Sequence, residues 1–196
     1  MIEWLLWVIL AYFIGAIPVG YLIGRFFYGK DLRKEGSGNI GATNAYRILG
    51  TKAGIFVFLL DFFKGWIAAS LGTGEPYLVL ACAIASVVGN DWSVFLKFKS
   101  GKGVACGVGA FTYISPAATF AAFLVWLFIF LWKKIVSLAS IISVPVVPLV
   151  IFLTGSPLAY SIGSLLAALL VIGKHKENMK RLWRGEEKPI VKGKRT

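Results

Sequence analysis

Long apolar runs separated by short basic clusters constrain this chain more than any other feature of its sequence. Five such runs occupy residues 4–27, 53–71, 77–98, 135–153 and 158–173. A helix needs about 20 mostly apolar residues to cross the hydrocarbon core of a bilayer. A soluble domain would carry far more polar surface than a chain in which 58% of the residues are hydrophobic. The pattern therefore predicts an all-α integral membrane protein.

A sixth apolar stretch, residues 103–132, is too long for one ordinary crossing. Ser115 and Pro116 lie near its middle, and proline begins helices well but interrupts them badly. The stretch therefore forms either one kinked, tilted helix or two short helices. In the second case the first helix would cover about residues 103–114.

The distribution of lysine and arginine favours two helices, because cytoplasmic loops collect these residues. With two crossings, every basic loop lies on one side of the membrane. The connections 72–76 and 154–157, which hold neither residue, then lie on the other side. We therefore predict a single transmembrane domain over residues 1–196 with seven transmembrane helices and a short fourth helix. The N-terminus lies outside in this topology, and the C-terminus lies in the cytoplasm.

The net charge of +12 has an ordinary explanation in this topology. It reflects the basic bias of cytoplasmic loops and an attraction to anionic lipid headgroups. We therefore expect membrane lipids as partners and no nucleic acid. Cys82 and Cys106 have no second Cys or His at ligand spacing, so we expect no metal site, no disulfide and no cofactor.

The stretch GSGNIGATNAYR at residues 36–47 begins with the pattern G-x-G-x-x-G. A dinucleotide fold would need a β-strand directly before these glycines, whereas a long apolar helix and a charged linker precede them here. A Walker A pattern is also missing, because Gly101-Lys102-Gly103 lacks the upstream glycine and the following Ser or Thr. The glycines therefore serve another purpose.

Three unusual polar stretches fall on the cytoplasmic side, at about residues 30–52, 97–105 and 173–187. Glycines in the first let backbone N–H groups turn toward an anion, and Arg47 suits bidentate phosphate binding. In the second, Lys102 precedes a helix N-terminus, which favours anions. We predict that the three stretches converge on one interfacial pocket for at least one phosphate-bearing ligand.

Simpler interpretations exist for each of these features. Glycine-rich loops often only connect helices, and basic loop residues often serve only topology. His175 would share a helix face with Asn178, although a lone histidine at a helix end is often a capping or interfacial residue. Asp61 and Lys64, three residues apart in an apolar segment, form either a structural ion pair or part of the polar floor of the pocket.

The stretches SGNIGATNAYR, FLLDFFKG, VFLKFKSGKGVA and GKHKENMKRLWRGEE resemble the signature segments of the bacterial membrane glycerol-3-phosphate acyltransferases that use acyl phosphate. The resemblance implies a seven-helix protein of the bacterial cytoplasmic (inner) membrane with its active site on the cytoplasmic side. The implied reaction transfers a fatty acyl group from acyl phosphate to the 1-hydroxyl of glycerol 3-phosphate and releases inorganic phosphate. The product is 1-acyl-glycerol 3-phosphate (lysophosphatidic acid), formed in the first acylation of phospholipid synthesis.

The resemblance also implies which residues carry the reaction. The predicted catalytic residues are Ser37, Asn39, Arg47, Lys102, His175 and Asn178. The residues predicted to bind substrate or phosphate are Gly38, Gly41, Thr43, Asn44, Gly101 and Gly103, with Asp61 and Lys64 beside them. The chain departs from the family at Asn90, where a histidine is common, and at Cys106, where a threonine often stands. These departures argue against an essential histidine or hydroxyl at the two positions.

Two sources of a general base follow from this reading. His175 is the one candidate among the three stretches, and the charges of Lys174 and Lys176 beside it would keep it neutral. The leaving phosphate of the donor, with a second pKa of roughly 6, could instead take the proton from the attacking hydroxyl. Ser37 as a covalent nucleophile lacks an identified base.

Two other functions compete with an acyltransferase. A membrane transporter of a phosphate-bearing anion or lipid would also use a polar pocket among helices, but transporters usually carry repeated halves, and no internal repeat is visible here. A lipid-binding scaffold without turnover is the third candidate. The sequence sets neither the acyl-chain preference nor the oligomeric state.

Overall fold

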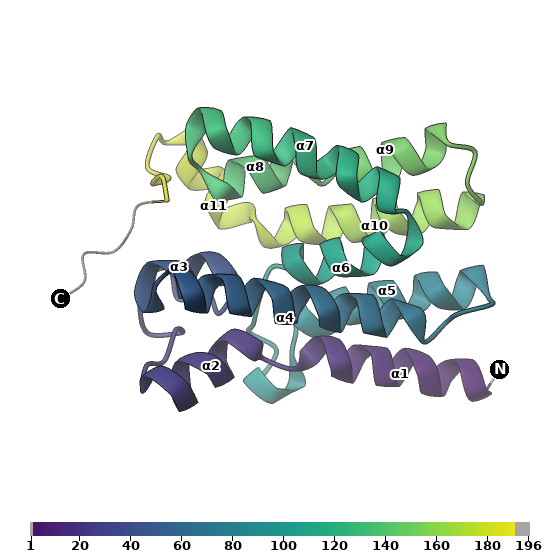
Figure 1. The fold of residues 1–196 in the computed structure, drawn as a ribbon, viewed down its shortest axis with the longest axis horizontal. Helices are drawn as coiled ribbons and strands as arrows, with labels where there is room; N and C mark the ends of the chain where they lie inside the picture. The colour runs from purple at the N-terminus through teal and green to yellow at the C-terminus, as the bar shows by residue number, and fades with distance from the viewer. Residues whose placement is uncertain (1, 191–196) are drawn as a thin grey trace.

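The computed structural model describes residues 2–190, and within them the chain is built from helices joined by short loops (Figure 1). Most of the long helices run side by side along the long axis of the molecule. In chain order the elements are α1 (Ile2–Ala16), α2 (Val19–Tyr28), α3 (Ala42–Leu49), α4 (Thr51–Ser70), α5 (Pro76–Asp91), the 3-10 turn η1 (Val94–Leu96), α6 (Val104–Ile114), α7 (Pro116–Lys133), α8 (Val136–Ser143), α9 (Val146–Leu153), α10 (Leu158–Lys174) and α11 (Lys176–Trp183).

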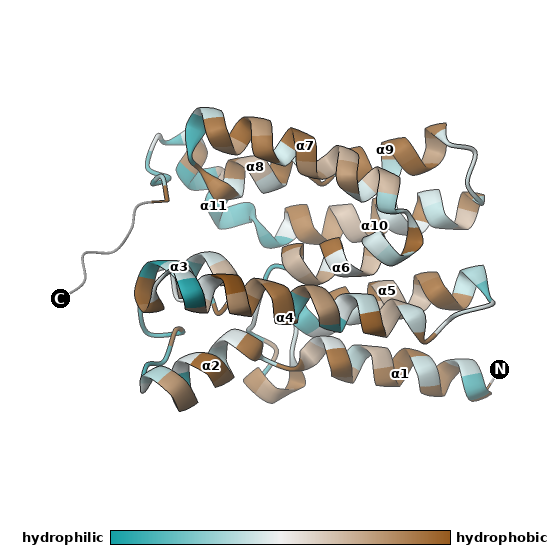
Figure 2. Cartoon of the chain, in the orientation of Figure 1, coloured by the Kyte–Doolittle hydropathy of each residue, from teal (hydrophilic) through white to brown (hydrophobic). Residues whose placement is uncertain are grey.

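The short helix α6 lies between two groups of helices (Figure 1). On one side α1 packs along α5, and α4 packs along both α3 and α6. On the other side α7, α8, α9 and α10 contact one another, and α10 also reaches back to α5 and α6. Figure 2 shows the hydrophilic residues gathered around α3 and α11, at one end of the bundle. The elements that carry the three polar stretches therefore end near one another.

Five helical segments within residues 2–190 are long and apolar enough to cross a membrane, and α10 with α11 makes a sixth candidate that bends by 58°. Large apolar side chains such as Phe56 and Phe128 remain exposed on these helices, which suits a surface covered by lipid. The prediction of an all-α membrane protein is confirmed. The count of seven crossings and the orientation stay predictions, because α6 alone is too short to span a bilayer.

The predicted break in the long apolar stretch is confirmed. Helix α6 ends at Ile114, and Pro116 occupies the first turn of α7, where its missing N–H costs nothing. The Ser115 hydroxyl caps α7 by accepting a hydrogen bond from the Ala118 backbone N–H at 3.3 Å. Two helices, α6 of 11 residues and α7 of 18 residues, therefore replace one kinked helix.

The buried pair Asp61 and Lys64 has a structural role. The Lys64 ammonium contacts the Asp61 carboxylate at 2.7 Å and donates to the Ile17 carbonyl at 3.0 Å. Ile17 lies at the break between α1 and α2, where helical hydrogen bonds are interrupted. Lys64 therefore ties α4 to this break. Asp61 also lines the central cavity described below, so it belongs to the ion pair and to the cavity wall.

Glycine allows α4 and α6 to approach backbone to backbone. A Cβ atom on Gly109 would lie 1.8 Å from the Phe62 carbonyl oxygen, and one on Gly65 would lie 2.0 Å from that of Cys106. Small residues at such crossings are typical of helix packing in membranes, where close contact replaces the hydrophobic effect. This contact fixes the position of α6, and with it the loop that carries Lys102.

We expect Gly109→Val to destabilise the protein by about 1–3 kcal/mol, because the new side chain must push α6 away from α4. The loss should appear as a lower Tm of the detergent-solubilised protein. Gly173→Ala is the matched control, because a Cβ atom at that helical glycine meets nothing within 4 Å. Equal Tm values for the two variants would contradict the packing argument.

Candidate active site

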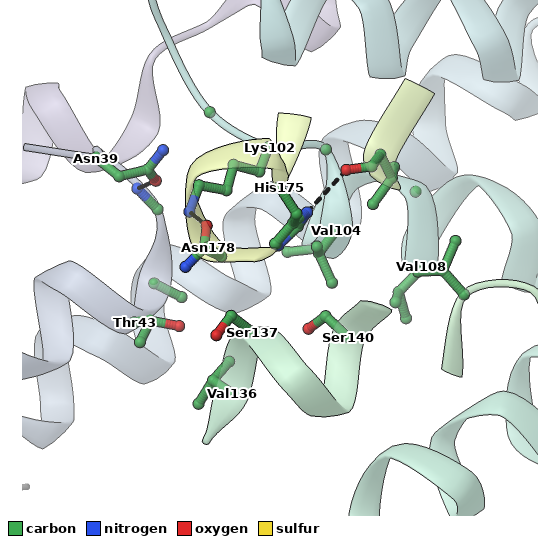
Figure 3. Close-up of a pocket in the computed structure, with 18 of the residues that line it drawn as sticks. Asn39, Thr43, Lys102, Val104, Val108, Val136, Ser137, Ser140, His175 and Asn178 are labelled. Atoms are coloured by element: carbon green, nitrogen blue, oxygen red, sulfur yellow. Dashed lines mark hydrogen bonds between the residues drawn. The ribbon is translucent and has the colours of Figure 1, made fainter. Parts of the chain in front are cut away.

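A cavity of about 1120 Å³ opens where the three polar stretches meet. The predicted site residues that line it are Ser37, Asn39, Gly41, Thr43, Asn44, Arg47, Asp61, Gly101, Lys102, Gly103, His175 and Asn178. In Figure 3, Asn39 and Thr43 approach from one side, while Lys102, His175 and Asn178 approach from the other. The predicted convergence on one pocket is confirmed. Gly38 and Lys64 do not line the cavity.

The loop of the first stretch is wound around the side chain of Asn44. Its amide nitrogen lies within 3.1 Å of the carbonyls of Leu32, Glu35 and Asn39. Its amide oxygen accepts the Ser37 N–H at 3.0 Å. Asn44 is 1% exposed, and these bonds occupy its polar atoms. That Asn44 contacts phosphate stays a prediction; in this structure its amide shapes the loop that presents Ser37.

Asn39 connects the first stretch to the second. Its side-chain oxygen accepts the Gly41 N–H at 2.8 Å, and its amide nitrogen approaches the Ser100 carbonyl at 3.4 Å. Gly41 immediately precedes α3, so the bond stabilises the start of that helix. Asn39 therefore sets how the N-terminus of α3 lies relative to the loop before α6.

Helix α3 presents a basic and a hydroxyl side chain to the cavity. Thr43 and Arg47 are four residues apart and lie on the same helix face. Among the described residues, neither the Thr43 hydroxyl nor the Ser37 hydroxyl makes a hydrogen bond, so both can serve a ligand. Arg47 approaches the Lys188 carbonyl at 3.4 Å. An N-terminal turn with a nearby guanidinium suits a phosphate group.

The second stretch places Lys102 just before the N-terminus of α6. Gly103 has a φ of +70°, and a Cβ atom there would lie 2.9 Å from Val87, so glycine is needed for this turn. The Gly101 N–H donates to the Asn90 carbonyl at 3.0 Å. The backbone carbonyl of Asn90 thus supports the loop before α6, and Asn90 also lines the cavity.

Lys102 and Asn178 join the second and third stretches. The Lys102 ammonium donates to the Asn178 side-chain oxygen at 2.5 Å. Burial lowers the pKa of Lys102 to about 8, and the positive charges of Arg181 and Arg47 add to this effect, while Glu187 opposes it. Because burial disfavours the charged form of Lys102, a phosphate dianion bound beside it would strongly stabilise the ammonium.

His175 is buried at the junction of α10 and α11, with 3% of its surface exposed. Its Nδ1 lies 2.7 Å from the Val171 carbonyl. A carbonyl can only accept, so Nδ1 carries the proton in the neutral ring and Nε2 is left as an acceptor. Burial lowers the pKa of His175, and the charge of Lys102 adds to this. The ring is therefore neutral near pH 7.

Glu187 holds together the side chains around Asn178, and sequence reasoning missed it. Its carboxylate accepts hydrogen bonds at 2.6 Å from the Ser137 hydroxyl, the Asn178 amide and the Arg181 guanidinium. Burial raises the pKa of Glu187, but these three donors outweigh burial and leave the pKa below its ordinary value. Only its place at the end of the third stretch hinted at such a role.

The segment after α11 forms part of the cavity wall, and Glu187 belongs to it. Glu186, Glu187, Lys188 and Pro189 all line the cavity. The segment is attached at its far end by the Ile190 N–H, which donates to the Lys134 carbonyl at 2.8 Å. The segment thus joins the cavity wall to the end of α7.

The described residues contain no group of three His, Cys, Asp or Glu side chains able to hold a metal ion. Four cationic side chains line the cavity (Arg47, Lys102, Arg181 and Lys188), together with three anionic ones (Asp61, Glu186 and Glu187).

The family model described as "Glycerol-3-phosphate acyltransferase" matches residues 5–185. The chain belongs to this family. It is 44% identical to glycerol-3-phosphate acyltransferase 2 of Moorella thermoacetica, over 94% of this chain and 96% of that protein. It is 43% identical to the glycerol-3-phosphate acyltransferase of Aquifex aeolicus, over 92% and 95% of the two chains.

Two solved structures share the fold of this family member. One is a crystal structure of PlsY (YgiH), an integral membrane glycerol 3-phosphate acyltransferase, in its glycerol 3-phosphate form; it has a TM-score of 0.92, 41% identity and 96% coverage of both chains. The other is the lysophosphatidic acid form of PlsY, with a TM-score of 0.89, 40% identity and 95% coverage of both chains.

For this acyltransferase family member, Lys102 gives a testable pH dependence. Deprotonation near pH 8 removes a charge that attracts phosphate, so KM for glycerol 3-phosphate should rise by up to about tenfold per pH unit above that value. Lys102→Arg should abolish this alkaline rise, because arginine stays protonated. The measurement is KM between about pH 7 and pH 10. A flat wild-type profile would contradict the assignment.

Glu187→Ala should lower both stability and activity, because it leaves three buried or half-buried donors without their acceptor. Loss of charge-assisted hydrogen bonds predicts a cost of about 2 kcal/mol, visible as a lower Tm. Because folding lowers the pKa of Glu187, its ionised carboxylate stabilises the folded protein above pH 4.5, the ordinary pKa value. This contribution to stability is lost as the pH falls below that value. Glu186→Ala is the neighbouring control, and equal Tm losses in both variants would count against the role of Glu187.

Proposed function

We propose that the protein transfers a fatty acyl group from acyl phosphate to the 1-hydroxyl of glycerol 3-phosphate, giving 1-acyl-glycerol 3-phosphate (lysophosphatidic acid) and inorganic phosphate. This is the first acylation of phospholipid synthesis. One observation carries the proposal: a single cavity has a basic, hydrogen-bonding end and an apolar end among membrane helices. Family membership and the named ligand forms of PlsY agree with it.

The polar end has room for two phosphate-bearing groups. Arg47 with the N-terminus of α3 makes one cationic position, and Lys102 with the N-terminus of α6 makes a second. A donor and an acceptor that each carry phosphate need two such positions at once. Ser37 and Thr43 add hydroxyl donors beside the first, and Asn178 lies beside the second.

The apolar end suits the acyl chain of the donor. Val104, Val108 and Phe111 of α6 line it, as do residues of α7 to α10. Phe58 of α4 and Phe123 of α7 also line the cavity, and they are 40% and 48% exposed at the surface of the bundle. Exposed rings in the cavity lining suit sideways entry of an acyl chain from the bilayer.

The transfer needs one bond made and one broken. The 1-hydroxyl oxygen of glycerol 3-phosphate attacks the carbonyl carbon of the donor, and the bond from that carbon to the phosphate oxygen breaks. The hydroxyl proton goes either to His175 Nε2 or to the departing phosphate, and both routes release inorganic phosphate. The cationic groups position both substrates and stabilise the developing negative charge.

A covalent route through Ser37 has less support, because no base contacts its hydroxyl among the described residues.

We place the protein in the bacterial cytoplasmic membrane with the polar end of the cavity toward the cytoplasm. The gathering of basic and polar residues at that end of the bundle favours this orientation.

The deciding experiment is phosphate release by purified protein given palmitoyl phosphate, with and without glycerol 3-phosphate, with the lipid product followed in parallel. Release that requires glycerol 3-phosphate and matches the lysophosphatidic acid formed would support the proposal. Palmitoyl-CoA in place of palmitoyl phosphate tests the choice of donor. Folded protein in lipid that releases no phosphate would overturn the proposal and favour a transporter or a lipid-binding scaffold.

A further inference from the structure

We propose that a packed apolar cluster closes the inner end of the cavity and limits the length of the acyl chain. The cluster consists of Phe111, Ala118, Ile151 and Ala167, all nearly or fully buried, with Val147 packed against them; we call it the floor cluster. The inference rests on the proposed function, because it assigns the apolar end to an acyl chain. It further names the residues that select among acyl chains of different length.

The depth of the cavity matches the space that one acyl chain occupies in a membrane. On α10 the cavity wall extends from the polar end at His175 to Ser164. At a rise of about 1.5 Å per residue this is roughly 16 Å. Half of a bilayer hydrocarbon core is about 15 Å. A chain can therefore leave one leaflet and lie at full length inside the protein.

The floor cluster marks the place where this space ends. Phe111, Val147 and Ala167 belong to the cluster and also line the cavity. Ala118 and Ile151, on the other side of the same cluster, are 0% exposed and do not line it. A chain that fills the cavity therefore meets the Phe111 ring and its neighbours, behind which the interior is packed.

Small side chains line the cavity above the floor cluster and beside it. Ser140 and Ser143 of α8 and Ser164 of α10 line the cavity with small side chains. The hydroxyls of Ser143 and Ser164 donate to carbonyls three residues earlier on their own helices, at 3.3 Å and 3.0 Å. Ser140 accepts from the Trp126 indole at 3.2 Å. These three hydroxyls are thus bonded within the protein, whereas the buried hydroxyl of Thr119, which also lines the cavity, has no partner among the described residues. The small serine side chains leave space for an apolar tail.

The test compares dodecanoyl, hexadecanoyl and eicosanoyl phosphate as donors for three variants. Phe111→Ala deepens the cavity, so the ratio of kcat/KM for eicosanoyl over hexadecanoyl phosphate should rise about tenfold. Ala167→Ile fills the floor, so the ratio for hexadecanoyl over dodecanoyl phosphate should fall about tenfold. Phe120→Ala is the matched control: Phe120 lies on α7, is 60% exposed and does not line the cavity, so both ratios should stay at their wild-type values.

A second readout separates this inference from the proposed function. Alkyl phosphates of the same lengths cannot transfer an acyl group, but they can raise Tm by binding. In the wild type, the Tm shift should increase with chain length up to a certain length and then stay constant. Ala167→Ile should move that plateau to a shorter chain. A limit of this kind in a protein without transferase activity would support the floor cluster while the proposed function failed.

Two results would overturn the inference. One is a wild-type Tm shift that keeps growing up to the eicosyl chain. The other is an unchanged length profile in Ala167→Ile, in both kcat/KM and Tm. The second result decides the matter even if Phe111→Ala does not fold, because Ala167→Ile adds volume without removing the core ring.

Discussion

Replacing Lys102 by methionine should lower kcat/KM for acyl transfer by about 10²–10³-fold, the cost of removing one fixed charge-stabilising donor from an active site. Methionine keeps most of the length of the side chain, so the change removes the ammonium while the cavity wall stays filled. The loss includes the bond to Asn178 at 2.5 Å. Asn178 would keep its bond to Glu187, so the surrounding side chains should hold their places.

Lys99→Met is the matched control for this experiment. Lys99 lies on the same loop and is exposed, but it does not line the cavity. It should keep activity close to wild type, with only a small effect through the overall charge. Equal losses of kcat/KM in the two variants would show that the loop acts through its overall positive charge. This result would contradict the specific role of Lys102 in the active site.

Replacing His175 by alanine should lower kcat/KM by about 10² or more, in the range expected for a general base. The Nδ1 bond to Val171 at 2.7 Å fixes the ring, and the lowered pKa keeps it neutral. Its Nε2 is then free to accept a proton, and His175 lies near Lys102 and Asn178 in Figure 3. The readout is the rate of lysophosphatidic acid formation, with Tm checked in parallel.

The pH profile separates the two possible bases. If His175 takes the proton, the acid limb of kcat/KM disappears in His175→Ala, because the group that titrates there is gone. If the leaving phosphate takes it, the limb remains near the second phosphate pKa of roughly 6. An active variant, within about tenfold of wild type, would move the base role to the substrate.

Much of the fold follows from local chemistry. Apolar runs of membrane length predict helices whatever their neighbours are, and Pro116 determines where α6 ends and α7 begins. The convergence of the three polar stretches was also predictable, because the positive-inside bias puts basic loops on one face. Resemblance to the family supplied the named residues, and the structure brings most of them to one cavity.

What the sequence could not give are the roles that depend on contacts between distant segments. Asn44 and Asn39 have the same side chain and lie in the same stretch. The amide of Asn44 bonds only to backbone groups of the loop before α3, whereas the amide of Asn39 approaches Ser100. A hydrogen bond to a backbone carbonyl leaves no trace in residue type. Asp61 and Lys64 were equally undecided until the Ile17 carbonyl appeared as the partner of Lys64.

The sequence by itself determined the helical membrane architecture, the short helix α6 and the set of polar residues gathered on one face, since length, hydropathy, proline and charge act locally. Only the tertiary structure decided that Glu187 binds Ser137, Asn178 and Arg181, and that the floor cluster closes the cavity. The contact between Glu187 and Ser137 spans 50 residues, and the floor cluster joins α6, α7, α9 and α10. Their existence depends on packing geometry, which no local pattern encodes.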